Sequence, residues 1–312
     1  MPRGAPLPIL IKPQLATLAR TPPPGKWLYE IKFDGYRLMC RIERGRASFF
    51  TRNGNDWTDR LAALRSRMEK QRLPDGWYDG EMVVLDEQGL PSFYLLQSAF
   101  KAKRTADIVL FLFDMPFCAG VDLRRYPLEE RRRALENLLD GGSSHIRFSE
   151  TLAGSPRDLV RSACKMGLEG LIGKRPDSPY VSRRSDAWIK LKCSQRQEFV
   201  IGGYTTSGSA LGGLLLGVYD DDKRLLYAGS VGTGFGGRTL SELNHELSKI
   251  PSLKSPFATT RSLKGAHWVE PRLVAEVSFA EWTPSGKVRH AAFKGLRLDK
   301  DAHQVRREVP KM

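Results

Sequence analysis

The composition of the chain changes after residues 188–194, WIKLKCS, and this change constrains the fold more than any other feature. The following segment is rich in glycine, with apolar runs such as EFVIGGY and LLLGVY separated by turns. TPSG at 283–286 is a good hairpin turn, and one helix is expected near 238–250. Several strands with one inserted helix suit a small barrel such as the OB-fold. We therefore expect two domains, residues 1–193 and 194–312.

The first part mixes strand and helix patterns. Residues 26–51 alternate strand-like runs with glycine turns, which predicts antiparallel strands. Further strands are expected at 78–86 and 108–115, and a polar helix near 57–70. The predicted fold class is therefore α+β, with antiparallel sheets flanked by helices.

Two more helices are predicted from their start signals. PLEERRRALENLL begins with Pro127 and carries four leucines on one face. Its Arg131–Arg133 run is interpreted as a solvated helix face. Residues 155–167 form the second helix, with Ser155 as N-cap and Pro156 at the first helical position.

The 312 residues carry a formal net charge of +15. The excess of Lys and Arg is spread over both parts instead of forming one basic tail, which favours two domains that face a polyanion. The alternative is a protein that is merely basic and soluble.

Several classes of protein are disfavoured. No apolar run is long enough for a membrane span, and the N-terminus lacks the order of a signal peptide, so we expect a soluble, cytoplasmic protein. The four cysteines are far apart, without a CxxC pair, which argues against structural zinc and offers no obvious disulfide framework. The glycine runs GSALGG and GTGFGG lack the GK[ST] of a phosphate loop and are interpreted as barrel turns.

The stretch YEIKFDGYR at 29–37 places Lys32 at the end of an apolar strand. A solvated lysine is one interpretation, and a nucleophile is the other. The motifs that follow in order favour the nucleophile: TRNG at 51–54, YDGE at 78–81, LFLFD at 110–114, EGLIGKR at 169–175, WIKLK at 188–192 and FKGLRLDK at 293–300.

This order and spacing resemble the covalent nucleotidyltransferase superfamily of ATP-dependent DNA ligases and mRNA capping enzymes. The similarity runs across almost the whole chain and is closest to the ligase module of bacterial nonhomologous end-joining ligases of the LigD type. PSFYLLQSAF, QEFVIGGYT and RHAAFKGLRLDK carry the closer resemblance. It implies an adenylation domain followed by an OB-fold, and a covalent Lys32–AMP intermediate made from ATP.

The resemblance also implies roles for other residues. Glu30 would read the adenine edge, Phe113 would stack on the base, and Arg37 and Arg52 would contact ribose or phosphate. Glu81 would hold the ribose or a metal, and Glu169 is the stronger candidate for a Mg²⁺ or Mn²⁺ carboxylate. Lys174 is expected to be a cofactor-binding cation that faces the Lys32 end of the strand. The remaining implied contacts are Lys190 and Lys192 on the α-phosphate, Arg184 on the triphosphate or the DNA 5′ phosphate, and Arg297, Asp299 and Lys300 on the pyrophosphate.

Each of these residues has a plainer interpretation when taken alone. Arg52 would be a turn arginine, Phe113 a core aromatic, and Glu169 a carboxylate at a helix end. The chain also departs from the family pattern at Gly173, Ala291 and Leu298. None of these departures removes a charged position of the motifs.

The alternatives are a capping-type guanylyltransferase that uses GTP, another polynucleotide ligase of the superfamily, and a non-catalytic nucleic-acid-binding OB-fold protein. An NAD-dependent ligase is disfavoured because an upstream extension and a cysteine zinc cluster are missing. The expected partners are nicked or broken double-stranded DNA, with Ku and polymerase or phosphoesterase modules of end joining. We expect a monomer on the bacterial nucleoid, with a hinge near Cys193–Gln197 that lets the second domain close over the nucleotide.

Overall fold

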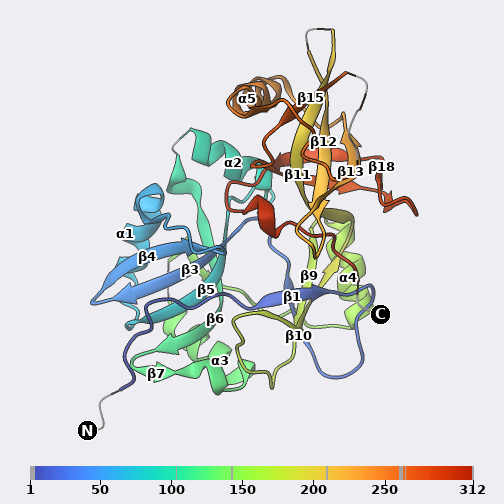
Figure 1. The fold of residues 1–312 in the computed structure, drawn as a ribbon. Coiled ribbons are helices and arrows are strands. Elements are labelled where there is room, and N and C mark those ends of the chain that lie inside the picture. Colours follow the sequence, from blue (N-terminus) through green and yellow to red (C-terminus); the bar gives the residue numbers. More distant parts are fainter. Residues whose placement is uncertain are drawn as a thin grey trace. The chain divides into compact units, whose positions relative to one another are not determined.

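The computed structural model describes residues 4–102, 104–141, 143–208, 210–259, 263 and 265–310. The chain divides into two compact units, Met1–Cys193 with Pro310–Met312, and Ser194–Val309 (Figure 1). Within the described ranges, no helix is long and apolar enough to cross a membrane.

The smaller sheet of the first unit joins segments that are far apart in the sequence. Its strand order is β1 (Leu15–Leu18), β10 (Arg184–Lys192), β9 (Gly170–Lys174) and β2 (Leu28–Ile31). Figure 1 shows β1, near the N-terminus, lying beside β10. β1 runs parallel to β10, and the other two pairs are antiparallel. At the start of β10, Thr17 Oγ1 donates to Asp186 Oδ1 at 2.9 Å and fastens this parallel pair.

The larger sheet contains two of the three strands that the alternation at 26–51 predicted, as an antiparallel pair, whereas the first of them, β2, belongs to the smaller sheet. Its order is β4 (Arg46–Thr51), β3 (Tyr36–Glu43), β5 (Gly76–Val83), β6 (Val109–Cys118) and β7 (Val121–Asp122), and β8 (Ile146–Phe148) pairs with β6. The turn into β3 requires Gly35, because a Cβ atom there would collide with the backbone oxygen of Met82. The glycine of the KFDG motif is therefore a packing requirement of the sheet.

The helices of the first unit cover the outer faces of both sheets. They are η1 (Thr58–Leu61), α1 (Ala62–Lys70), α2 (Phe93–Lys101), η2 (Thr105–Asp107), η3 (Leu123–Arg125), α3 (Leu128–Leu139) and α4 (Pro156–Lys165). α1, α2 and α3 contribute to one core with the larger sheet, and α4 packs on the smaller one. The helices predicted near 57–70, from Pro127 and at 155–167 are confirmed, and Ser155 Oγ caps α4 by accepting from Asp158 N at 3.3 Å.

The prediction that Arg131–Arg133 is a solvated helix face is wrong for two of the three residues. Arg131 and Arg132 are 1% and 4% exposed, whereas Arg133 is exposed. The guanidinium of Arg131 donates to both oxygens of the buried Asp114, at 2.7 and 2.8 Å. Buried guanidinium groups persist when a carboxylate neutralises them and carbonyls fill the remaining donors, as the carbonyls of Tyr126 and Ser178 do here.

The expectation drawn from cysteine spacing also needs correction. Cys164 of α4 and Cys193, the residue after β10, form a disulfide, while Cys40 and Cys118 are free and buried. The Cα atoms of Cys164 and Cys193 lie 5.2 Å apart because β9 and β10 return the chain to the end of α4. The disulfide therefore joins Cys193, where the first unit meets Ser194 of the second, to α4.

The second unit is built around one long strand. β11 (Gln195–Ser207) pairs with β12 along one edge, and with β16 and β15 in succession along the other. The other elements are β12 (Ala210–Tyr219), β13 (Leu225–Val231), α5 (Gly237–Ser248), β14 (Pro251–Ser252), β15 (Ala266–Val269), β16 (Val274–Phe279), β17 (Glu281–Trp282), β18 (Val288–Arg289), β19 (Ala292–Leu296) and η4 (Ala302–Gln304). The helix near 238–250 and the TPSG hairpin are confirmed as α5 and as the turn between β17 and β18.

Candidate active site

Strand pairing places the predicted motif residues of the smaller sheet on one face. Trp188 pairs with Lys174, which pairs with Leu28, and in the next row Lys190, Ile172 and Glu30 are partners. Alternate residues of a strand point to the same side of a sheet. The odd-numbered residues pack against α4. The even-numbered residues therefore share the opposite face: Glu30, Lys32, Lys174, Trp188, Lys190 and Lys192.

The larger sheet presents a second row of motif residues. Arg37, Glu81 and Phe111 are register partners on β3, β5 and β6. Arg52 follows β4 directly after Thr51, the partner of Leu38, so it lies next to Arg37 across the strands. Phe113 and Trp188 belong to one core cluster, with ring centroids 6.1 Å apart. The motif-bearing faces of the two sheets thus pack against each other.

Lys32 lies directly after β2, where its backbone N–H donates to Gly170 O at 3.0 Å. Its ammonium group is ion-paired with Glu169, and their side chains are 19% and 8% exposed. A lysine attacks phosphorus only as the neutral amine. Lys32 must therefore leave this ion pair and give up a proton before it can attack.

Glu30 is almost fully buried and is the centre of a polar network. Arg132 Nη1 donates to Oε1 at 2.8 Å, and Ser149 Oγ donates to Oε2 at 2.7 Å. Lys174 Nζ lies 2.7 Å from the same Oε1, within ion-pair distance but without the alignment of a good hydrogen bond. Two cations and one hydroxyl thus hold this carboxylate between the sheets.

Lys174 has an unusual environment for a lysine. Its ammonium lies 4.2 Å from the ring centroid of Phe113 and 4.4 Å from that of Trp188. Burial lowers the pKa of Lys174 to about 8, although the nearby Glu30 carboxylate acts in the opposite direction. This lysine can change charge near neutral pH.

Arg37 is held by Asp79. The guanidinium donates to both carboxylate oxygens of Asp79, at 2.5 and 2.7 Å, and Tyr180 OH donates to the same carboxylate at 2.6 Å. Burial disfavours the charge of Arg37, but Asp79 outweighs it and leaves the pKa of Arg37 raised. The guanidinium lies 4.5 Å from the centroid of Phe113, so a base that stacks on this ring must share it with Arg37.

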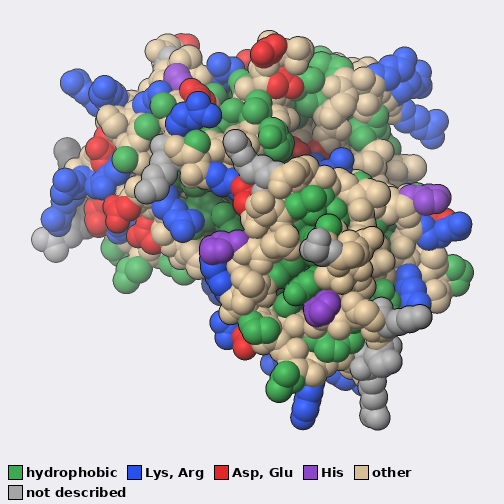
Figure 2. All heavy atoms as spheres, turned by 90° about the horizontal axis from the view of Figure 1, so that it is seen from above, with side chains coloured by type: hydrophobic (Ala, Val, Ile, Leu, Met, Phe, Trp, Pro, Cys, Tyr) green, Lys and Arg blue, Asp and Glu red, His purple; other side chains and the backbone are tan. Residues whose placement is uncertain are grey.

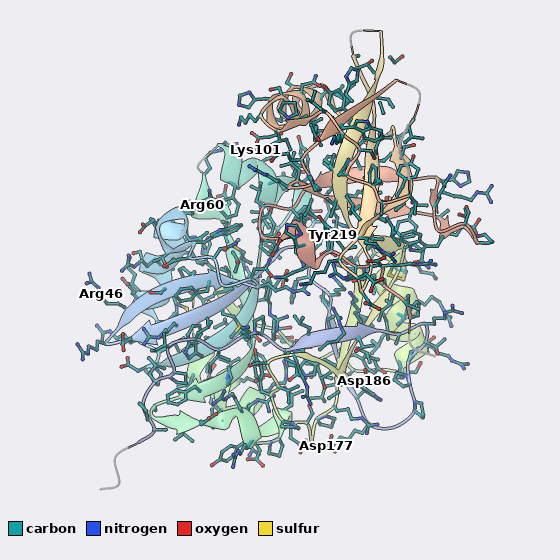
Figure 3. All side chains as sticks on the ribbon, in the orientation of Figure 1. Arg46, Arg60, Lys101, Asp177, Asp186 and Tyr219 are labelled. Carbon is teal, nitrogen blue, oxygen red and sulfur yellow. A yellow bond between two sulfur atoms is a disulfide. The ribbon has the colours of Figure 1, made fainter. Side chains whose placement is uncertain are left out.

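Arg184 is the predicted residue of the first unit that the structure does not bring to the others. It is exposed, donates to Ala16 O, and lies six residues before Lys190 on the same strand. That separation corresponds to roughly 20 Å along an extended strand. Its assignment to a phosphate stays a prediction. Figure 3 labels Asp186, which lies two residues further along β10.

The FKGLRLDK motif at 293–300 forms a charge network inside the second unit. Arg297 donates to both oxygens of Asp299 at 2.9 Å and to Glu276 Oε2 at 2.8 Å. Lys300 Nζ lies 2.9 Å from Glu198 Oε1, and Arg196 Nε donates to Glu276 at 3.0 Å. Arg297 is only 11% exposed, so it is not one of the barrel's exposed charges.

The described residues contain no group of three or more His, Cys, Asp or Glu side chains arranged to hold a metal. Mg²⁺ bound at phosphotransfer sites commonly takes one or two carboxylates and fills its other positions with water and phosphate oxygens. Glu81, which is half-buried, and Glu169, whose side chain is nearly buried, fit that minimal donor set.

Sequence reasoning missed four residues on or behind these faces: Ile172, Trp188, Arg132 and Ser149. The period of two that links Lys190 and Lys192 also includes Trp188, and pairing then adds Ile172. Arg132 lies on the same helical stripe as Leu128 and Leu135. No sequence signal marks Ser149.

The comparisons with known proteins match both units. Residues 11–192 match the family model described as "ATP dependent DNA ligase domain", and residues 207–300 match "ATP dependent DNA ligase C terminal region". The chain belongs to the ATP-dependent DNA ligase family. The predicted α+β class, an adenylation domain of antiparallel sheets with a C-terminal OB-fold, is thereby confirmed.

Relatives of this ligase-family chain include the "Multifunctional non-homologous end joining protein LigD" of Pseudomonas aeruginosa, 50% identical over 98% of the chain and 37% of the relative. The Mycobacterium tuberculosis LigD is 36% identical over 91% of the chain and 38% of the relative. The chain thus spans a little over a third of these relatives. Among solved structures, "mycobacterial DNA ligase D complexed with ATP and MES" has a TM-score of 0.70 and 35% identity, covering 96% of this chain and 98% of that one.

Proposed function

We propose that the chain seals breaks between a 5′ phosphate and a 3′ hydroxyl in double-stranded DNA, through an AMP group carried on Lys32. The observation that carries this proposal is the strand pairing that sets Lys32, Lys190 and Lys192 on one face, opposite Arg37 and Glu81. We assign residues 1–193 to adenylation and residues 194–312 to the OB-fold domain.

The first step makes the lysyl-AMP bond. The neutral Lys32 amine attacks the α-phosphorus of ATP, a P–N bond forms, and the P–O bond to pyrophosphate breaks. The amine loses a proton in the process. Lys190 and Lys192 would neutralise the α-phosphate, and a reaction of this kind depends mainly on such positioning and charge stabilisation.

Two DNA steps follow. A 5′ phosphate oxygen attacks the same phosphorus, which releases Lys32 and leaves AMP joined to the DNA end. The 3′ hydroxyl then attacks the 5′ phosphorus and expels AMP. Glu81 and Glu169 would hold Mg²⁺ or Mn²⁺, which when bound supplies positive charge to the phosphate oxygens.

The names of the LigD relatives support a place in bacterial nonhomologous end joining, on nicked or broken DNA. Ku and polymerase or phosphoesterase modules are the partners that we propose for it there. We propose that the chain acts as a monomer in the bacterial cytoplasm, at the nucleoid. Lys and Arg side chains are scattered over the face seen in Figure 2. This distribution suits a protein that binds the phosphate backbone of DNA, with an affinity that falls as salt concentration rises.

The test compares nucleotides and then sealing. The chain is incubated with α-labelled ATP or GTP and a divalent metal, denatured, and separated on a gel. Label from ATP but not GTP, followed by sealing of a nicked duplex after ATP is removed, is the expected result. Label from GTP would favour a capping-type guanylyltransferase, and binding of DNA without any label would favour a non-catalytic protein.

A further inference from the structure

Three consecutive arginines of α3 have three different environments. Arg131 is buried and bound to Asp114, Arg132 is buried and reaches Glu30, and Arg133 is exposed. Their neighbouring positions on one helix make them natural controls for one another. Only Arg132 of the three contacts a residue of the candidate nucleotide site.

Arg132 ties together three segments that are remote in sequence. Nη1 donates to Glu30 Oε1 at 2.8 Å on β2 and to the backbone oxygen of Phe113 at 3.1 Å on β6. Nη2 donates to the backbone oxygen of Ser149 at 2.6 Å, and the hydroxyl of that serine donates to Glu30 Oε2. One guanidinium therefore fixes both the carboxylate and the backbone beneath the Phe113 ring.

The acceptor capacity of Glu30 leaves room for one more donor. A carboxylate offers about four acceptor positions. Arg132 and Lys174 approach Oε1, and Ser149 approaches Oε2. A ligand that donates an N–H to the open position on Oε2 would complete the set.

Near Glu30 lies a buried hydrogen-bond donor that has no partner. Within the described part of the chain, Trp188 Nε1 has no hydrogen-bond acceptor, although its indole is 1% exposed. Lys174, 4.4 Å from that ring, links the indole to Glu30. An acceptor position on the carboxylate and an unused indole donor match a heteroaromatic base that carries both an amino group and ring nitrogens.

We propose that Arg132 is a positioning residue that sets purine specificity, holding Glu30 and the Phe113 backbone so that the site accepts a 6-amino purine and rejects a 6-oxo purine. This inference rests on the proposed function. A 6-oxo group would place a second acceptor against a carboxylate in a buried site, and such an unpaired contact strongly disfavours binding.

The choice of arginine follows from geometry. A guanidinium can hold the Glu30 carboxylate and two backbone oxygens at once, whereas a lysine ammonium is a point charge on a flexible stem. Arg132→Lys keeps the charge and loses the fixed fork. It therefore separates positioning from simple neutralisation.

The experiment measures Lys32–AMP and Lys32–GMP formation against nucleotide concentration for Arg132→Lys, Arg132→Ala and Ser149→Ala, with Arg131→Lys and Arg133→Ala as controls. For Arg132→Lys we expect a rise of about tenfold in KM for ATP and a fall of about tenfold in the ATP-to-GTP preference, with little change in kcat. Arg131→Lys should lower Tm and leave the preference unchanged. Arg133→Ala should match the wild type.

Sealing of a nick that already carries the 5′ adenylate reports whether each variant is folded. If Arg132→Ala fails this check, Arg132→Lys and Ser149→Ala decide the question. A folded Arg132→Lys that discriminates as the wild type does, or equal loss of preference in Arg131→Lys, overturns the inference. Absence of labelling in the wild type would instead refute the proposed function.

Discussion

The two units place their charged residues in contrasting ways. On the facing sheets of the first unit, the motif cations are Lys32, Arg37, Arg52, Lys174, Lys190 and Lys192, and the carboxylates beside them are fewer: Glu30, Asp79, Glu81 and Glu169. In the second unit, three cations and three carboxylates contact one another: Arg196, Arg297, Lys300, Glu198, Glu276 and Asp299. Excess positive charge suits a polyanionic ligand, and a balanced network suits a stable fold.

The contrast also concerns what each site must do before it acts. Lys32 has to leave one carboxylate, Glu169, and lose a proton. Arg297 would have to exchange two well-made carboxylate contacts to reach a nucleotide. If Arg297 serves the first step, we predict that the second unit closes over the nucleotide, with a hinge near Cys193–Gln197.

The largest expected effect is on the nucleophile. Lys32→Ala should abolish covalent AMP labelling because Lys32 is the one lysine in YEIKFDGYR, so the variant has no amine at the end of β2 to attack ATP. Lys26→Ala is the control, since that lysine is 78% exposed and 3.9 Å from its partner Glu129. The measurement is label on denatured protein, and acid-labile label on Lys32→Ala would refute the assignment.

Arg297→Ala tests the closure of the second unit. It should fail to form Lys32–AMP from ATP, yet seal a pre-adenylated nick within roughly tenfold of the wild type. Arg289→Ala, which breaks an exposed pair with Glu281, is the control. If both activities fall together and high salt mimics the defect, Arg297 binds DNA and the closure hypothesis is wrong.

The carboxylates of the first unit should show a smaller but still large effect. Glu81→Ala or Glu169→Ala should slow adenylation and sealing by at least ~100-fold and shift the metal requirement. Rates are compared across a series of Mg²⁺ and Mn²⁺ concentrations, with the exposed Glu129→Ala as control. Near wild-type rates at low Mn²⁺ would show that these carboxylates are structural.

The smallest effect concerns Lys174 and pH. Its pKa of about 8 lies below the ordinary 10.5, so between these values the unfolded chain holds a proton that the folded chain has lost. Raising the pH through this window therefore favours the folded state. The free energy of unfolding of the wild type should rise relative to Lys174→Met, by at most roughly 3 kcal/mol. Parallel denaturation curves from pH 7.5 to 10.5 would contradict this.

The sequence predicted the fold best where local pattern and tertiary pairing agree. Alternation and turn chemistry located β3 and β4, and a period of two placed Lys190 and Lys192 together. The prediction for α3 is wrong at Arg131 and Arg132 because their position on the helix, and not their charge, decides their burial. Leu128, Leu135 and Leu139 define a stripe that contains both arginines.

Other features depend on contacts that no local pattern encodes. Cys164 and Cys193 are 29 residues apart and meet only through the return of β9 and β10. Glu30 was predicted to read adenine, but its partners Arg132 and Ser149 come from segments more than a hundred residues away. Such partners follow from the three-dimensional arrangement alone.

Successive side chains in each strand of the smaller sheet point to opposite faces. The site is therefore sensitive to whether an odd or an even number of residues is inserted into or deleted from a strand. Deleting one residue inside β10 would turn Lys190 and Lys192 toward α4, and bring Ile189 and Leu191 to the face of the candidate nucleotide site. Deleting two would keep the faces and only shorten the strand. We therefore expect inherited length changes in such chains to accumulate in loops, and those within β2, β9 or β10 to occur in even steps.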